Sequence, residues 1–325
     1  MSLTGPRLAC QNPASADQPP VYIITDSSAE IIHPLEPVIV ALLSPYGRPT
    51  LTSRELPKPL VDKFNGLLRE GQRLFGCEQR RSWVIAIDQN TVVKIRAGMD
   101  MDHISNLHCI NKYAPELPVP SFLGALRSGV FSYVFLSRLR GETLDSAWPT
   151  LTTADKAAVQ SQLGDMILYL RRMYPLTPPF FLGSFSSGVC KFVREGNTLS
   201  VEKMYNENML NVFLCNQGRS KMESSLVLRT MRHDHRLVLT WGDIQPRNIM
   251  IERNKRSAIR GSISITGLLH WNFAGWYPEH WEATRAIYLA ERPGAIQDWI
   301  VYLPRFLFGD YPAEYTTDLA IRHCL

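Results

Sequence analysis

The chain has 325 residues, of which 45% are hydrophobic and 20% are charged. This composition is that of an ordinary globular protein, and it excludes a disordered, collagen-like or coiled-coil protein. The length suits one large domain or two modest ones, either of which buries a core without disulfides or metal ions. The net charge of +5, from 35 basic and 30 acidic residues, is small and scattered. We therefore expect no nucleic-acid partner.

The six cysteines are too far apart in sequence for a CxxC zinc motif or a disulfide framework. We therefore expect a reducing compartment and a cytoplasmic location. Residues 1–20 are polar, carry proline and serine, and lack the apolar segment of a signal peptide, so we predict a flexible tail. The apolar run Pro37 to Leu43 is far shorter than the ~20 residues that span a bilayer, and we expect no membrane association.

The first part of the chain is rich in predicted strands. The apolar spacing over Leu60 to Leu74 predicts an amphipathic helix. Residues 82–87 and 91–95 are β-rich runs around a short polar break, which predicts a hairpin. A second helix is predicted over 104–113, before a proline-rich segment, and residues 130–136 favour another strand.

The later part of the chain is predicted to be more helical. Candidate N-cap residues precede a strong helical stripe over 155–172. Residues 176–200 are rich in proline, glycine and serine and favour loops. Short β-like runs return over 237–273, and residues 279–308 favour helices. The change in pattern near residues 137–140 predicts a hinge between two lobes, and a cleft between lobes is a common small-molecule site.

One segment of this later part carries a pattern that indicates chemistry. Asp243 and Asn248 stand five positions apart on a Gly- and Pro-bearing loop between apolar runs. A second loop, His270 to Gly275, follows the next β-like run. Phosphoryl transfer needs a carboxylate for the attacking hydroxyl, oxygen ligands for the metal ion and a lysine for the phosphates.

At these residues the sequence resembles the aminoglycoside phosphotransferase and choline-kinase-like superfamily, in its fungal phosphotransferase branch. The family pattern His-Gly-Asp-x-x-Pro-x-Asn-Ile is met at Gly242, Asp243, Pro246, Asn248 and Ile249. The family pattern Gly-x-x-Asp-Trp-Glu-x-Ala-Gly is met at Gly267, Trp271, Ala274 and Gly275. The segments Gly141 to Leu144 and Val92 to Lys94 also match, and the resemblance covers about residues 60–310.

The resemblance implies a two-lobed, protein-kinase-like α+β fold in one kinase-like unit. Residues 21–138 would form a small β-rich N-lobe of the nucleotide-binding type. Residues 139–325 would form a larger, mostly helical C-lobe with the catalytic loop and the acceptor side. The implied activity is transfer of a phosphoryl group from ATP, with Mg²⁺ or Mn²⁺, to a hydroxyl of a small molecule.

The resemblance also implies roles for individual residues. Asp243 takes the position of the catalytic base, and Asn248 takes a metal-ligand position. Lys94 takes the position of the phosphate-binding lysine, and Ser137 and Leu139 lie where the family meets the adenine.

The chain departs from the family pattern at four positions. Trp241 replaces a largely structural histidine, and His103 or a neighbouring aspartate falls where a glutamate pairs with the lysine. His270 replaces the metal-binding aspartate, and Asn272 replaces a glutamate. Magnesium prefers oxygen ligands, whereas imidazole suits zinc, copper, iron or nickel. The metal site is therefore expected to be degenerate.

These departures leave three readings open. The chain is a phosphotransferase with impaired metal binding, a pseudokinase that serves as a binding or scaffold protein, or an enzyme that uses His270 as acid or base in the same cleft. His270 itself is either a metal ligand or a packed histidine in a decayed site. A separate pattern, His233-x-His235, has the spacing of a metal motif but no third ligand nearby in sequence, so we expect a solvated loop there.

Overall fold

The chain forms two compact units in the computed structural model. The structure describes residues 20–44, 54–173, 181–185, 187–194, 196–200, 203–216, 221–253, 263–292, 294–309 and 311–323. The predicted tail lies outside these residues except for Pro20. The first unit comprises Met1–Ile104 and Pro120–Leu139, and the second comprises Ser105–Val119 and Arg140–Leu325. Both units combine helices and strands, so the predicted α+β class is confirmed.

The first unit is built on one antiparallel sheet of seven strands in the order β2-β1-β6-β7-β5-β4-β3. Its strands are β1 (Ala29–His33), β2 (Glu55–Leu56), β3 (Gln72–Cys77), β4 (Ser82–Ala86), β5 (Thr91–Ala97), β6 (Phe122–Ser128) and β7 (Phe131–Ser137). The predicted hairpin is confirmed, since β4 and β5 pair antiparallel with Val84 opposite Lys94. The predicted strand at 130–136 corresponds to β7, whereas β3 and β6 were not predicted.

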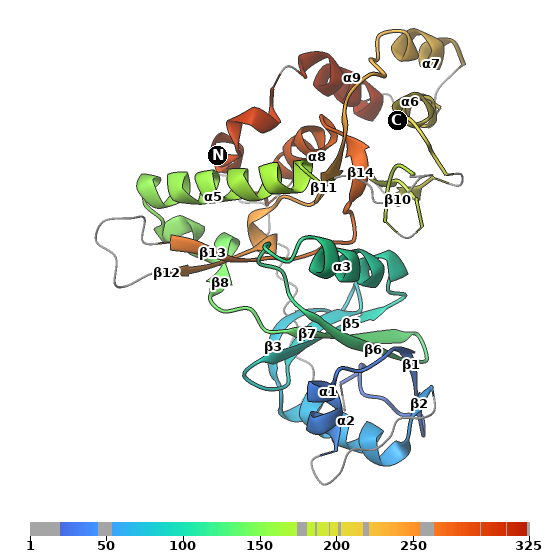
Figure 1. Ribbon diagram of the computed structural model, residues 1–325, viewed down its shortest axis with the longest axis vertical. Helices are drawn as coiled ribbons and strands as arrows, with labels where there is room; N and C mark the ends of the chain where they lie inside the picture. Colours follow the sequence, from blue (N-terminus) through green and yellow to red (C-terminus); the bar gives the residue numbers. More distant parts are fainter. Residues whose placement is uncertain are drawn as a thin grey trace, which may run out of the picture. The chain divides into compact units, whose positions relative to one another are not determined.

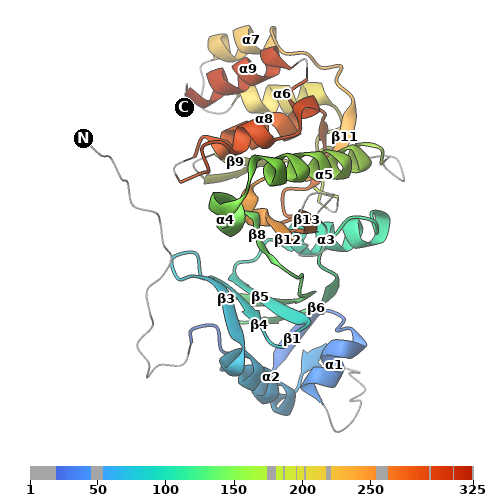
Figure 2. The same ribbon diagram turned by 90° about the vertical axis from the view of Figure 1, so that its left-hand side faces the viewer.

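Two helices, α1 (Pro37–Leu43) and α2 (Lys58–Glu70), lie against one face of this sheet (Figure 2). The predicted amphipathic helix is α2, which buries Val61, Phe64 and Leu68 against strand residues such as Ile85. Because these residues recur at helical spacing, a single stripe of α2 supplies much of this core. The helix ends at Glu70, earlier than predicted, and after Gly71 the chain continues into β3.

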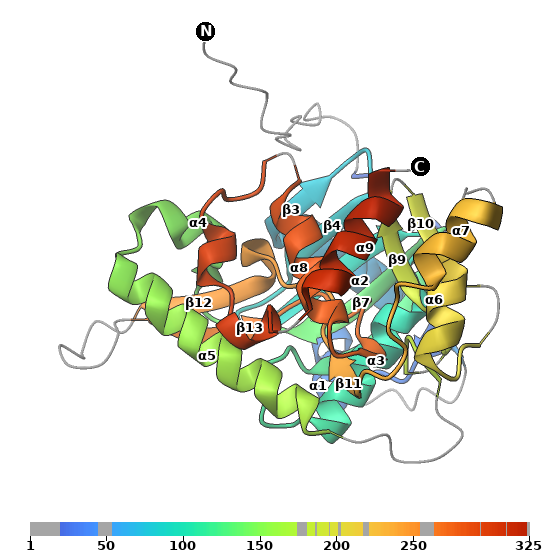
Figure 3. The ribbon, with the colours of Figure 1, turned by 90° about the horizontal axis from the view of Figure 1, so that it is seen from above.

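The second unit is larger and contains most of the helices (Figures 1 and 3). The helix α3 (Met101–Tyr113) begins in the first unit and continues in the second. The other helices are α4 (Leu144–Ala147), α5 (Thr153–Arg171), α6 (Glu207–Cys215), α7 (Lys221–Leu228), α8 (Trp281–Ala290) and α9 (Pro312–His323). Short 3-10 turns lie at Trp148–Thr150, Pro246–Asn248, Trp299–Tyr302 and Arg305–Leu307.

The long helix α5 begins where the sequence predicts. Thr152 is its N-cap and forms a capping box with Asp155, whose carboxylate accepts from the Thr152 backbone N–H. This exchange satisfies two backbone donors that the first helical turn leaves without a partner. In the second unit α5 packs against strands β11 and β13 (Figure 1).

Two small sheets of the second unit carry the segments that the motifs occupy. β11 (Leu237–Thr240) pairs with β14 (Gly275–Pro278), and β13 (Ile263–Leu268) pairs with β12 (Ile249–Arg253), which also pairs with β8 (Glu142–Thr143). The predicted β-like runs over 237–273 are thereby confirmed for the described residues. The loop after β11 leads into β12, and the loop after β13 leads into β14.

The prediction of loops over residues 176–200 is wrong for part of that range. β9 (Lys191–Arg194) pairs antiparallel with β10 (Gly196–Leu199). The glycine and serine content of the segment suited a loop, but a two-stranded ribbon tolerates glycine at its ends. The helices α6, α7 and α9 were also not predicted.

No helix among the described residues is both long enough and apolar enough to cross a bilayer.

Candidate active site

The loop after β11 is a tight turn that only glycine fits. Gly242 has φ +76°, in the left-handed region where a side chain is strained. A Cβ atom at this position would lie 2.7 Å from the backbone oxygen of Phe273. Glycine therefore allows the loop that carries Asp243 to approach the loop that follows β13.

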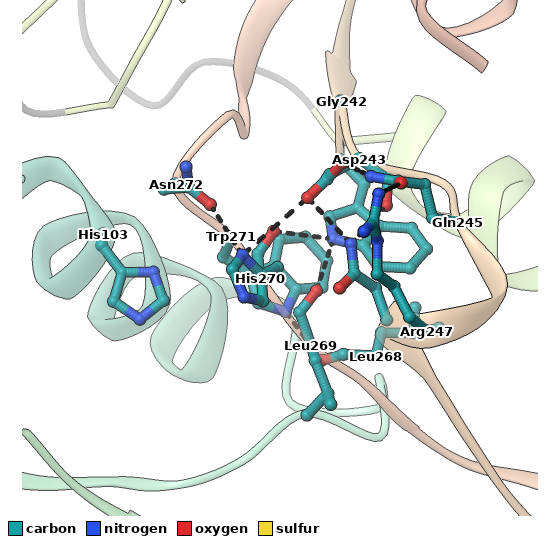
Figure 4. A network of polar contacts seen from close by, with 12 residues as sticks. His103, Gly242, Asp243, Gln245, Arg247, Leu268, Leu269, His270, Trp271 and Asn272 are labelled. Atoms are coloured by element: carbon teal, nitrogen blue, oxygen red, sulfur yellow. Dashed lines mark hydrogen bonds and ion pairs between the residues drawn. The ribbon is translucent and has the colours of Figure 1, made fainter. Parts of the chain in front are cut away.

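Asp243 is buried and held by two amide side chains (Figure 4). Its Oδ2 accepts a hydrogen bond of 2.8 Å from Asn248 Nδ2, and its Oδ1 accepts one from Gln245 Nε2. Gln245 in turn accepts from the Arg247 guanidinium. This chain of contacts fixes the rotamer of the carboxylate, because both of its oxygens have a donor.

Burial raises the pKa of Asp243 above its usual value of 3.8. The buried Arg285 guanidinium and the hydrogen bonds from Gln245 and Asn248 act in the opposite direction. A carboxylate with a raised pKa is a stronger base once ionised, and raised carboxylate pKa values are typical of catalytic positions.

The second loop brings His270 to this carboxylate. His270 Nδ1 lies 3.9 Å from Asp243 Oδ2 and 3.4 Å from Asn272 Oδ1. Its backbone has φ +63°, which is uncommon for a residue other than glycine and occurs often at functional sites. The side chain of His270 is 42% exposed, whereas that of Asp243 is 7% exposed. The ring of His270 thus faces both the carboxylate and solvent.

Trp241 connects the loop that carries Asp243 to the loop that carries His270. Its indole Nε1–H donates to the backbone oxygens of Leu269 and His270, at 3.0 and 3.2 Å. Its side chain is fully buried and lies 5.8 Å from the ring of Trp271. Trp241 therefore supplies both packing and a donor at the position where the resembling family has a histidine.

Glu282 on α8 holds the other side of the Asp243 loop. Its two carboxylate oxygens accept from the backbone N–H groups of Trp241 and Gly242, at 2.7 and 2.8 Å. Burial raises the pKa of this carboxyl, and the two backbone hydrogen bonds oppose that shift. Arg285, one turn later on α8, donates to the Gly242 carbonyl at 3.5 Å. The N-terminal half of α8 is thus fastened to the loop.

Asn106 on α3 fastens the second loop. Its Nδ2 donates to the backbone oxygens of Trp271 and Ala274, at 3.0 and 2.9 Å, and its Oδ1 accepts from the Ser184 hydroxyl at 2.9 Å. The residue is completely buried. All of its side-chain hydrogen-bonding groups are engaged, so it defines the conformation of the loop between His270 and Gly275.

Sequence reasoning missed both Glu282 and Asn106. In each case a signal was present, because a polar residue interrupts an otherwise apolar helical face. Asn106 lies between Ile104 and Leu107 on the buried face of α3, where an amide needs partners.

The side chains around Asp243 fit magnesium poorly. Mg²⁺ requires near-octahedral oxygen coordination and is usually held by one or two carboxylates with phosphate oxygens. Here His270 presents an imidazole nitrogen and Asn272 a neutral amide, so Asp243 is the carboxylate of this group. The amide nitrogen of Asn248, the predicted metal ligand, donates a hydrogen bond to the Asp243 carboxylate. A degenerate metal site stays a prediction for this group of side chains.

The other predicted site residues, Lys94, Ser137 and Leu139, belong to the first unit. Lys94 lies on β5, and its Nζ is 3.1 Å from Nε2 of His103 on α3. An ammonium group can only donate, so His103 accepts through an unprotonated Nε2. His103 is one of the alternatives left open by the sequence, and Asp100 accepts from the backbone N–H of Asp102.

Ser137 and Leu139 lie at the end of β7. The Ser137 hydroxyl accepts a hydrogen bond of 2.8 Å from the backbone N–H of Ser121. The backbone N–H of Ser137 donates one of 3.0 Å to the backbone oxygen of Ser121. Leu139 is the last residue of the first unit. Among the described residues, these contacts do not test whether Ser137 or Leu139 binds a nucleotide.

No protein-family model and no curated protein matches the chain. Solved structures give low similarities. The streptomycin–ATP ternary complex of the aminoglycoside phosphotransferase APH(2″)-IIa is 11% identical with a TM-score of 0.48, over 82% of this chain and 87% of that chain. Aminoglycoside-3′-phosphotransferase of type VIII is 14% identical with a TM-score of 0.45, over 78% and 92%. APH(3″)-Id from Streptomyces rimosus is 12% identical with a TM-score of 0.44, over 81% and 97%. Similarity at this level does not establish a shared activity.

Proposed function

We propose that the chain is an ATP-dependent phosphotransferase that acts on a hydroxyl of a small molecule and binds its metal ion weakly. The observation that carries this proposal is the buried Asp243 carboxylate, held at both oxygens by Gln245 and Asn248. A fixed carboxylate with a raised pKa suits a base that accepts one proton in each turnover.

In the proposed reaction the acceptor hydroxyl donates its proton to Asp243. The hydroxyl oxygen bonds to the γ-phosphorus of ATP, while the bond from that phosphorus to the β,γ-bridging oxygen breaks and releases ADP. Asp243 then returns the proton to solvent. Gln245 and Asn248 keep the carboxylate oriented, and Glu282 keeps the loop in place. Such positioning is the main task of a protein in phosphoryl transfer.

The nucleotide is proposed to use the first unit. Lys94 would bind phosphates, and the segment from Ser137 to Leu139 would meet the adenine. Lys94 makes a hydrogen bond to an imidazole nitrogen here, at the place where the resembling family has an ion pair with a glutamate. Such a contact still orients the ammonium group, although it neutralises no charge. We also propose the lobe boundary at residues 138 and 139, with the acceptor bound by the later lobe.

A second candidate function is that of a pseudokinase that binds a small molecule or protein without transfer. The observation that favours it is the pair of neutral side chains, His270 and Asn272, beside Asp243. Without a second carboxylate, metal-bound triphosphate loses much of its electrostatic stabilisation.

Nucleotide binding separates the two candidates. Thermal unfolding is measured with ATP alone and with ATP plus Mg²⁺, Mn²⁺ or Zn²⁺, for the wild type and for Lys94→Met. The phosphotransferase proposal expects stabilisation of the wild type by ATP with a metal ion, since a ligand at 100 times its Kd adds about 2.7 kcal/mol. Lys94→Met is expected to lose this stabilisation. If no combination stabilises the wild type, ATP is not the ligand and the phosphotransferase proposal fails.

A further inference from the structure

Three side chains that are far apart in sequence meet inside the second unit. Glu207 begins α6, His235 precedes β11 and His280 precedes α8. Their ligand atoms all lie within 4.8 Å of one another, and all three residues are buried. Of the pattern His233-x-His235, only His235 belongs to this cluster, and the fold brings Glu207 and His280 to it from elsewhere in the chain.

We infer that Glu207, His235 and His280 form a binding site for a divalent transition-metal ion, with zinc the best match. One oxygen, Glu207 Oε1, lies 2.7 Å from His235 Nδ1 and 3.2 Å from His280 Nε2. Two ligands at about 2.0–2.1 Å from a tetrahedral zinc ion lie roughly 3.3 Å apart. The 3.2 Å separation is close to this value, the 2.7 Å separation is shorter, and the two histidine nitrogens lie within 4.8 Å of one another. Binding the ion therefore requires these side chains to adjust but needs no other ligand to be brought in.

The donor set suits zinc in kind as well as in spacing. Two imidazole nitrogens and one carboxylate oxygen are ligands that zinc takes with three protein side chains and one open position. Thr284, Glu314 and Thr317 line a small pocket beside His280, which offers room for a water molecule as the fourth ligand.

The groups around the three ligands would also orient them. The second oxygen of Glu207 accepts from the His235 backbone N–H at 2.9 Å, which turns Oε1 toward the two rings. Glu314 Oε1 lies 3.3 Å from His235 Nε2, on the side of the ring opposite Nδ1. A histidine that binds zinc through one nitrogen typically donates its other N–H to a carboxylate, and Glu314 stands at that position.

The buried carboxylates around the two histidines also favour a bound cation. The side chains of Glu207 and Glu314 are 3% and 7% exposed, so two carboxylates are buried around two histidines. The nearby Arg232 is exposed and pairs with Asp234 at 3.0 Å instead. Buried charges need a close partner, and a divalent cation would balance both carboxylates. His280 Nδ1, the ring nitrogen on the side away from the proposed ion, makes no hydrogen bond within the described residues.

A metal ion here would stabilise the candidate active site without taking part in its chemistry. His235 lies five residues before Thr240, the last residue of the strand that leads to Asp243. His280 directly precedes α8, whose Glu282 holds the Asp243 loop through two backbone N–H groups. The ion would join α6 to both segments, in the region where α6, α8 and α9 gather (Figure 3).

Zinc binding by the full chain, without an affinity tag, tests the inference. The protein is stripped with a chelator and titrated with Zn²⁺ against a chromophoric competitor. His280→Gln keeps a polar side chain but removes the imidazole, and His233→Gln is the matched control because His233 is exposed in the same segment. We expect one zinc ion per wild-type chain, unchanged affinity for His233→Gln and at least about tenfold weaker binding for His280→Gln.

Two further measurements keep the test decisive. Asp243→Asn is expected to bind zinc like the wild type, which separates this site from the candidate active site. Cobalt added to the stripped wild type is expected to give the intense visible absorption of a tetrahedral ion, a result that needs no variant to fold. Absence of bound zinc or of the tetrahedral cobalt spectrum in the wild type would overturn the inference and leave a hydrogen-bonded cluster centred on Glu207. Equal zinc affinity of the wild type and a folded His280→Gln would also overturn it.

Discussion

The indole N–H of Trp241 donates a hydrogen bond of 3.2 Å to the backbone oxygen of His270. This contact, with its companion to Leu269, connects the loop that carries Asp243 to the loop that faces it. The resembling family has a histidine where Trp241 stands. In this chain the connection is made by an indole N–H, a donor that does not titrate.

Replacing Trp241 with Phe is expected to lower the free energy of unfolding by about 0.5–1.5 kcal/mol beyond the loss of packing, because two partly buried hydrogen bonds lose their donor. Chemical denaturation measures this difference. Trp299→Phe is the matched control, since Trp299 is equally buried and its N–H makes no hydrogen bond in the described residues. Equal destabilisation by the two variants would show that the Trp241 hydrogen bonds add nothing.

Gly242→Ala is expected to be more destabilising than the same change at a permissive glycine. Both Gly242 and Gly98 have positive φ, which costs alanine about 1–2 kcal/mol. Only at Gly242 does the added methyl group meet another loop, at Phe273, whereas nothing lies within 4 Å of Gly98. Thermal unfolding of the two variants compares them directly. A similar loss of stability would contradict the close packing of the two loops.

The pH dependence of turnover is expected to reflect Asp243. Burial raises the pKa of this carboxyl above 3.8, and a general base must be ionised to accept a proton. Therefore kcat/KM should rise with pH through the raised pKa, and its acid limb should lie above that of an exposed aspartate. A profile that stays flat down to pH 4 would exclude Asp243 as the base.

His270→Asp is expected to strengthen Mg²⁺-dependent ATP binding, because it supplies the oxygen ligand and the negative charge that magnesium requires. The backbone at residue 270 has φ +63°, a conformation that aspartate and asparagine tolerate better than most residues. His270→Asn is therefore the control, with the same shape and no charge.

Calorimetric titration of ATP with and without Mg²⁺ measures the effect of both variants. We expect the affinity gain in His270→Asp alone, and only with the metal ion present. If His270→Asn gains as much, the change acts through shape or backbone conformation, and residue 270 does not lie at a decayed metal position.

The sequence was most informative where a segment has a single period. Two β-rich runs around a polar break predict the hairpin of β4 and β5. The apolar stripe over α5 predicts that helix, and the candidate N-caps before it include Thr152. In these segments the secondary structure that the residues favour locally is also the one that buries their apolar side chains. The β9–β10 ribbon was missed because its strand formers stand in a longer segment rich in the proline, glycine and serine that mark loops.

For the candidate site, the sequence identified the residues but not the contacts that hold them. Asp243 and Asn248 are close in sequence, and their hydrogen bond follows from a five-residue spacing. Asn106 reaches Trp271 from 165 positions away, and His280 lies 73 residues from Glu207. Such pairings depend on how helices and loops pack, for which a single sequence carries no periodic signal.

The central claim is that Asp243 acts as the base in phosphoryl transfer from ATP. The most direct test follows the labelled γ-phosphoryl group of ATP, with Mg²⁺ or Mn²⁺, into water and into a panel of polyhydroxylated small molecules, for the wild type and Asp243→Asn. The account predicts transfer by the wild type and a rate about 10²–10⁴ times lower for the variant. No transfer by the wild type, or equal transfer by a folded Asp243→Asn, would contradict it.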